Sequence, residues 1–249
     1  MKIAVIGGTG FVGSFVVEEA LKRGHETTAI VRRPETVPVR PGLTAVGVDV
    51  QDPDRLGVPY DEDRLVRAFD GHDVIISCFN PGHDLRVNPN LYRDVIEGTR
   101  AIIDGMNRSD VNRIVYLGGA GSLHVPSGKM LVDDLDFFAS LVANTPEGTL
   151  VPEGPPIIDI PRAARIALYL FELEKALEWT FFSPPLYMGN FDRATGRVRY
   201  GSDAMLLDEN GNSALLDIRD LAFALVEEAE KAQHVRKHVT VATEPPIKM

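Results

Sequence analysis

The sequence predicts an α/β protein built on a doubly wound, mostly parallel sheet. Between Met1 and Ala120, short apolar runs alternate with longer amphipathic stretches, which is typical of strands joined by crossover helices. A Gly-rich turn follows the first apolar run directly. The 249 residues, of which 44% are hydrophobic, suffice for one such domain. We therefore expect a single domain over residues 1–249 with a small C-terminal lobe.

The periodicity of apolar residues places the elements of the first half. Apolar runs predict strands at Ile3–Ile6, Thr27–Val31, Thr44–Val48, Val74–Ser77 and Arg113–Leu117. Apolar residues at helical spacing predict helices at Val12–Arg23, Asp61–Phe69 and Pro89–Asn107. These helices would cover the two faces of the sheet.

The second half is less regular. Prolines and glycines between Val125 and Pro161 predict a loop or lid around one short segment at Asp134–Val142. The remaining predictions are a helix at Arg162–Glu178, a strand from Glu178 to Ser183, a hairpin at Leu206–Leu216, a helix at Ile218–Lys231 and a strand at His238–Ala242.

Charge and cysteine content exclude several kinds of partner. The net charge is −10, so nucleic acid and anionic membranes are poor partners. The single cysteine, Cys78, cannot form an internal disulfide, and we expect a cytoplasmic protein. The N-terminus runs into the Gly-rich turn as a strand rather than a signal peptide. No apolar run approaches the ~20 residues of a membrane span, and the scattered histidines suggest no metal site.

The Gly-rich turn predicts a dinucleotide site. Gly7 permits a tight turn, Gly10 lets the backbone approach a pyrophosphate, and Gly13 allows close packing of helix and strand. Such a turn can also merely join two elements, but its place in a strand–helix–strand pattern favours the cofactor. The residues expected to contact the cofactor here are Gly7, Thr9, Gly10, Phe11, Val12 and Gly13.

The end of the second predicted strand favours NADP(H) over NAD(H). An acidic residue there would bind the ribose 2′-hydroxyl of NAD, but this chain has Arg32 and Arg33. A guanidinium can pair with a 2′-phosphate. The alternative is that both arginines are solvated loop residues.

Two further segments follow strands and would lie along the cofactor. Asp49 and Val50 follow the third strand, where they could hold the adenine amino group. The second segment, which follows the fourth strand, consists of Cys78, Phe79, Asn80 and Pro81. Asn-Pro-Gly is also simply a favourable turn sequence.

Several motifs together resemble those of the atypical short-chain dehydrogenase/reductase group. They are the Gly-rich turn, Val31–Pro34, Gly118–Leu123, Trp179–Pro185 and Asp217–Ala222. The group includes proteins called NAD-dependent epimerase/dehydratase or NADH-flavin reductase, with NmrA-like and biliverdin-reductase-B-like relatives. The resemblance covers nearly the whole chain. It implies a Rossmann-type fold with Gly119, Pro184 and Leu186 beside the cofactor, and substrate-side elements at about 122–161 and 184–217.

The catalytic pair of the wider superfamily is missing. None of the tyrosines has a lysine four residues later, as the Tyr-x-x-x-Lys motif requires. Tyr169 could take the place of that tyrosine, although a role in the core or pocket wall is the alternative. Ser122 could donate a hydrogen bond to a substrate or be a turn residue, and His124 could be an acid or a pocket wall.

These observations leave three hypotheses for function. The first is an NAD(P)H-dependent oxidoreductase that reduces a small, flat, conjugated acceptor such as a flavin or a quinone, because such acceptors can take a proton from water. The second is a non-catalytic NADP(H)-binding sensor of NmrA-like type. A sugar-nucleotide epimerase or dehydratase is disfavoured by the missing pair. The sequence does not predict an oligomeric state.

Overall fold

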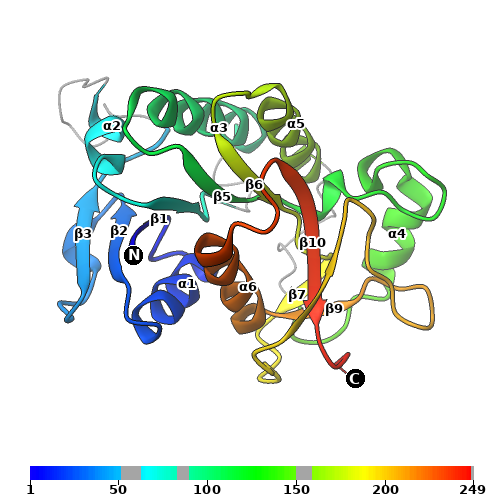
Figure 1. Cartoon of the computed structure of the whole chain (residues 1–249). Coiled ribbons are helices and arrows are strands. Elements are labelled where there is room, and N and C mark those ends of the chain that lie inside the picture. The colour runs from blue at the N-terminus through cyan, green and yellow to red at the C-terminus, as the bar shows by residue number, and fades with distance from the viewer. Residues whose placement is uncertain (52–62, 83–89, 150–158, 248–249) are drawn as a thin grey trace.

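In a computed structural model, which describes residues 1–51, 63–82, 90–149 and 159–247, the chain forms an eight-stranded sheet (Figure 1). The strand order is β3-β2-β1-β4-β5-β6-β10-β8, and every neighbouring pair is parallel except β10 with β8. The strands are β1 (Lys2–Ile6), β2 (Glu26–Val31), β3 (Leu43–Gly47), β4 (Val74–Ser77), β5 (Arg113–Leu117), β6 (Glu178–Phe182), β8 (Val198–Gly201) and β10 (Lys237–Thr243). A separate parallel pair joins β7 (Tyr187–Gly189) to β9 (Leu215–Asp217).

Helices cover both faces of the sheet. One face carries α1 (Phe11–Lys22) and α6 (Ile218–Lys231), and the other carries α2 (Arg64–Phe69), α3 (Leu91–Arg108) and α5 (Asp159–Leu173) (Figure 1). Alternate residues of β1 supply the two cores: Ile3 and Val5 pack with α1 and α6, whereas Ala4 and Ile6 pack with α3 and α5. This is the doubly wound, Rossmann-like α/β fold that the sequence predicts.

The strand order places the switch point of the topology between β1 and β4. From β1 the chain moves outward through β2 to β3, and it then returns to β4 on the other side of β1. Ligands of such sheets bind outside the carboxyl ends of the strands at this point. The Gly-rich turn after β1 and the segment after β4 therefore share one edge of the sheet.

The predicted elements agree with the structure wherever local periodicity is strong. The bounds of β4, β5 and α6 are those predicted, and those of the other predicted strands and of α1 differ by one residue at one or both ends. The start of the predicted helix at Asp61 and the residue Pro89 lie outside the described residues; the described helices begin at Arg64 and Leu91.

The bounds of α5 differ from the prediction at both ends. The helix begins at Asp159, because Pro161 in its first turn needs no intrahelical N–H partner. It ends at Leu173, well before Glu178. The Glu174 carboxylate accepts a hydrogen bond from the Ala176 N–H (2.7 Å), and such a local bond favours a turn over a continued helix.

The segment predicted as a loop or lid contains regular structure in its described part; residues 150–158 of it lie outside the described residues. It contains a 3-10 turn at Leu131–Asp133 and the helix α4 (Leu135–Ala143), which agrees with the short segment predicted at Asp134–Val142. Leu131, Phe138 and Leu141 form a third apolar cluster with residues of the C-terminal half, namely Tyr187 and Met205.

The predicted hairpin is present but short: it has one antiparallel bridge, and the N–H groups of Asp208 and Ala214 donate to the carbonyl oxygens of Asn212 (2.9 Å) and Leu206 (2.8 Å). That bridge joins Leu207 to Ser213, and the following residues pair in parallel with β7 instead. The sequence also did not predict β7 or β8, which are short and are defined by their partners in the fold.

Candidate functional site

The Gly-rich turn after β1 requires glycine at two positions. Gly7 has a φ of +75°, and a Cβ at this position would lie 2.8 Å from the Cys78 carbonyl oxygen. A Cβ at Gly13 would lie 2.1 Å from the Gly7 carbonyl oxygen. The turn and the first helical turn of α1 therefore pack more tightly than any side chain permits.

The N-terminus of α1 is open. Gly10 is the N-cap residue, no side chain caps the helix, and no acidic residue lies in its first turn. Thr9, Gly10 and Phe11 are exposed, and Val12 is half-buried. Free N–H groups and the positive end of the helix dipole favour an anion here, so these residues fit the pyrophosphate of a dinucleotide.

Arg32 and Arg33 follow β2, at the same edge of the sheet as the Gly-rich turn that follows β1. Both side chains are exposed, and within the described ranges neither guanidinium makes a hydrogen bond or an ion pair. The Arg33 carbonyl oxygen accepts hydrogen bonds from the N–H (3.1 Å) and the hydroxyl (2.7 Å) of Thr36, which fixes the backbone of the turn. Both cationic groups are available for an anionic ligand.

The residues after β3 are buried. Asp49 is only 4% exposed, and its Oδ1 accepts a hydrogen bond from the Gln51 N–H at 3.1 Å. Arg64 Nη2 donates to the Asp49 carbonyl oxygen at 3.1 Å. Val50 is also buried. The predicted contact of this segment with adenine stays a prediction.

The residues after β4 combine packing and turn roles. Burial raises the pKa of the Cys78 thiol to about 12, which excludes a reactive thiolate near neutral pH. The Phe79 ring lies where a side chain at Gly98 of α3 would otherwise be. Asn80 Oδ1 accepts a hydrogen bond from the Gly82 N–H at 2.8 Å, so this side chain shapes the turn that contains half-buried Pro81.

The turn after β5 packs closely on β6 and α5. A Cβ at Gly118 would lie 2.2 Å from the Phe181 ring, and one at Gly121 would lie 2.3 Å from the Pro161 carbonyl oxygen. A Cβ at Gly119 would lie 3.3 Å from Ala164. The close contacts of this turn with β6 and α5 therefore require glycine at positions 118 and 121.

The three candidate catalytic side chains have separate partners. The Ser122 hydroxyl is buried, donates to the Gly119 carbonyl oxygen (3.1 Å) and lies 2.8 Å from Ser183 Oγ. His124 Nδ1 lies 3.4 Å from Asp203 Oδ2, and the Tyr169 hydroxyl lies 3.7 Å from the sulfur of Met130.

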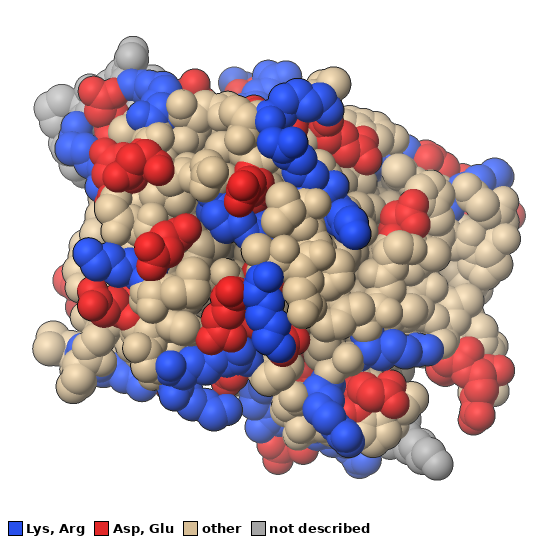
Figure 2. All heavy atoms as spheres, in the orientation of Figure 1, with Lys and Arg blue, Asp and Glu red and all other residues tan. Residues whose placement is uncertain are grey.

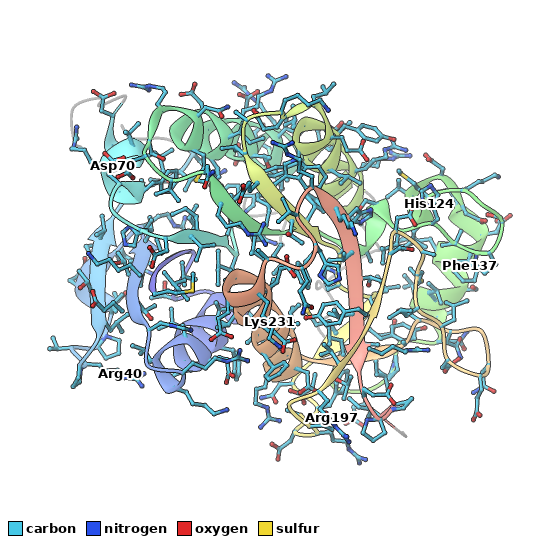
Figure 3. The ribbon with its side chains drawn as sticks, in the orientation of Figure 1. Arg40, Asp70, His124, Phe137, Arg197 and Lys231 are labelled. Carbon is cyan, nitrogen blue, oxygen red and sulfur yellow. The ribbon has the colours of Figure 1, made fainter. Side chains whose placement is uncertain are left out.

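Two of these candidates are neighbours. Met130 pairs with His124 through an isolated antiparallel bridge, so Tyr169 and His124 contact the same residue. His124 lies at the start of the segment after β5 that carries α4, which we call the insertion (Figure 3). Ser122 points inward, so its predicted role toward a substrate stays untested. The alternative of a turn residue has direct support from its bond to Gly119.

The segment after β6 joins the two substrate-side parts of the chain. Pro184 is buried, and the N–H of half-buried Leu186 donates to Ser213 Oγ at 3.1 Å. The Tyr187 hydroxyl donates to the carbonyl oxygen of Leu141 in α4 at 2.6 Å. Sequence reasoning did not predict Ser183 or His238 as part of this region. Ser183 lies within the motif Trp179–Pro185, whereas no local pattern distinguishes His238.

Neither a cluster of metal-ligating side chains nor a membrane-spanning helix is found in the part of the chain that the structure describes. The described residues hold no group of three or more His, Cys, Asp or Glu side chains suited to a metal ion. Among the same residues, no helix combines the length and apolar character needed to cross a membrane. Acidic and basic side chains are interspersed on the face seen in Figure 2.

The fold and the open Gly-rich turn define a dinucleotide-binding α/β protein. The model of a family described as NAD(P)H-binding matches residues 7–210. The chain belongs to this family, and a nicotinamide nucleotide is therefore its cofactor. Its fold is of the oxidoreductase type.

Full-length relatives support this placement. YwnB of Bacillus subtilis is 28% identical over 248 residues, which are 98% of this chain and 99% of that protein. A provisionally named epimerase from Bacteroides thetaiotaomicron is 33% identical with a TM-score of 0.76, covering 97% of this chain and 96% of that one. A provisionally named NADH-flavin reductase from Streptococcus pneumoniae is 25% identical with a TM-score of 0.73, covering 98% and 100%.

Proposed function

We propose that the chain is an NAD(P)H-dependent reductase of a flat, conjugated acceptor such as a flavin or a quinone, and that it prefers NADPH to NADH. The observation that carries this proposal is the open N-terminus of α1 beside two arginines without a protein partner among the described residues. The similarity to the NADH-flavin reductase of Streptococcus pneumoniae supports the choice of acceptor.

The chain's own residues would bind and orient the reactants. The N–H groups of the first turn of α1 would hold the pyrophosphate, and Arg32 and Arg33 would pair with a 2′-phosphate. Pro184 and Leu186 would form an apolar surface for the nicotinamide end. When bound, the nicotinamide supplies a hydride to the acceptor.

The missing Tyr-x-x-x-Lys pair is compatible with this reaction. A flavin or quinone can take its proton from water, so placing the two rings in contact is the main requirement. Ser122 points inward and Tyr169 contacts a methionine sulfur. Neither arrangement favours an epimerase or dehydratase, which depends on a positioned acid or base.

Steady-state oxidation of NADPH tests the enzyme hypothesis. With FMN, riboflavin and a soluble quinone as separate acceptors, we expect turnover with at least one of them. Tight NADP(H) binding without turnover on any acceptor would overturn the reductase proposal and favour the sensor of NmrA-like type.

Substitution of the two arginines tests the cofactor preference. Arg32→Ala and Arg33→Ala should each raise the Kd for NADPH by about 10- to 100-fold, because a hydrogen bond to a charged group contributes ~1.5–3 kcal/mol. Binding of NADH should not change. Arg100→Ala is the control, since Arg100 is exposed on α3 and pairs with Glu97. Equal effects on NADPH and NADH would contradict the preference.

A further inference from the structure

A chain of side-chain hydrogen bonds connects the last strand of the sheet to the turn after β5. His238 Nε2 lies 2.8 Å from Ser183 Oγ, which lies 2.8 Å from Ser122 Oγ. Ser122 Oγ in turn lies 3.1 Å from the carbonyl oxygen of Gly119. Both serines are fully buried. This series of hydrogen bonds thus runs from β10, past the end of β6, to the turn after β5.

The last acceptor in this series of hydrogen bonds, the Gly119 carbonyl oxygen, fixes the direction in which each hydroxyl donates. A carbonyl oxygen only accepts, so the one hydroxyl proton of Ser122 is donated to Gly119. Ser122 must therefore accept from Ser183, and Ser183, having donated its own proton, must accept from His238. It follows that His238 carries a proton on Nε2.

The surroundings of His238 favour its neutral form. The imidazole is half-buried, with the Phe181 ring packed edge-on at a centroid distance of 5.7 Å. Burial lowers the pKa of His238 to about 4, although the nearby Asp203 carboxylate raises it and His124 lowers it further. At neutral pH the ring therefore has one proton, and the hydrogen-bond chain requires that proton on Nε2.

We propose that His238 is a positioning residue for the nicotinamide end of the site. Its Nε2–H orients the hydroxyls of Ser183 and Ser122, and these hold the Gly119 carbonyl and the Gly118–Ser122 turn against which the nicotinamide would lie. The inference rests on the proposed function of this site. It assigns Ser122 an internal role in place of contact with the substrate.

Three substitutions separate hydrogen bonding from packing. His238→Leu removes the donor, whereas His238→Gln keeps an N–H group that can reach Ser183. His72→Leu is the matched control, because His72 is also half-buried, with its ring nitrogens 2.9 Å from the Phe69 carbonyl oxygen and 2.9 Å from Thr28 Oγ1. It takes no part in the turn after β5.

Binding of two ligands reports on the two ends of the site. For His238→Leu we expect about a tenfold higher Kd for NADPH, the loss of roughly one net hydrogen bond. The Kd for adenosine 2′,5′-bisphosphate, which lacks the nicotinamide, should not change. His238→Gln should restore most of the affinity for NADPH, and His72→Leu should lower only the thermal midpoint. Equal losses for the Gln and Leu variants, or equal losses for both ligands, would overturn the inference.

The imidazole nitrogens of the wild-type protein give an independent readout. In ¹⁵N-histidine NMR at pH 7, His238 should show the neutral tautomer with its proton on Nε2. A charged ring or a proton on Nδ1 would overturn the inference whether or not the protein turns over NADPH. Failure of the reductase assay alone would overturn the proposed reaction and leave the hydrogen-bond chain intact.

Discussion

Asp217 illustrates how one buried carboxylate can fix a loop. It precedes α6 and is fully buried. Its Oδ1 accepts from the N–H (3.0 Å) and Nε (3.1 Å) of Arg219, and its Oδ2 accepts from the Arg193 N–H (3.0 Å). Burial raises the pKa of this carboxyl, but the hydrogen bonds outweigh burial and the pKa is lowered. The ionised form is therefore the one that stabilises the fold.

Asp217→Asn should destabilise the protein by about 1.5–3 kcal/mol at pH 7, because hydrogen bonds to a charge are lost in a buried site. Urea unfolding measures the difference. Since the folded-state pKa is lowered, the stabilisation is complete above the unfolded pKa and is lost as the pH falls through the folded value. The gap between wild type and variant should thus shrink in acid.

Asp192→Asn provides the control for this substitution. Asp192 pairs with the same Arg219 at 3.0 Å, but its side chain is 91% exposed. Exposed ion pairs contribute only about 0–1 kcal/mol. A loss at Asp192 as large as that at Asp217 would show that burial is not the deciding factor.

At the scale of elements, Arg113 joins β5, β6 and α6. Its Nη1 donates to the Glu178 carbonyl oxygen (2.7 Å), and its Nη2 donates to Thr180 Oγ1 (2.9 Å) and Glu228 Oε1 (2.7 Å). Glu228 Oε2 also lies 2.8 Å from His234 Nδ1. Burial lowers the pKa of Arg113, while Glu228 opposes that shift. The pair is buried and its charges balance.

Arg113→Met should destabilise the protein by about 3–5 kcal/mol, because it leaves the Glu228 carboxylate buried without its cation. Adding Glu228→Gln removes that charge and should recover part of the loss. Chemical denaturation of both variants measures the effect. If the double variant were less stable than Arg113→Met, the uncompensated charge would not be the cause.

At the scale of the molecule, the insertion after β5 and the segment after β6 form one lobe beside the sheet. Phe138 of α4 packs in the same apolar cluster as Tyr187 and Met205. Thr149 also bridges to Gly189 of β7. A Cβ at Gly189 would lie 2.1 Å from the Gly148 carbonyl oxygen, so this contact requires glycine.

Gly189→Ala should therefore separate the end of the insertion from β7. We expect faster hydrogen exchange in α4 and β7, with little change in β1 and β4, because the sheet has its own core. Gly128→Ala, in the same insertion, is the comparison. A Cβ at Gly128 would meet no atom within 4 Å, and the only strain would come from its left-handed φ of +80°, so its effect should be smaller. Equal exchange rates in wild type and Gly189→Ala would contradict this account of the lobe.

The sequence by itself determined the α/β class, the bounds of β4, β5 and α6, and the glycine turn of the cofactor site. These features depend on apolar periodicity and on steric limits between residues close together in the chain. The tertiary structure decided the pairing of β7 and β8 and the inward orientation of Ser122. The reason is that their partners are distant in sequence: Ser122 meets Ser183 across 61 positions, and Ser183 meets His238 across 55. No local pattern specifies such a partner, and only the folded sheet brings the three side chains together.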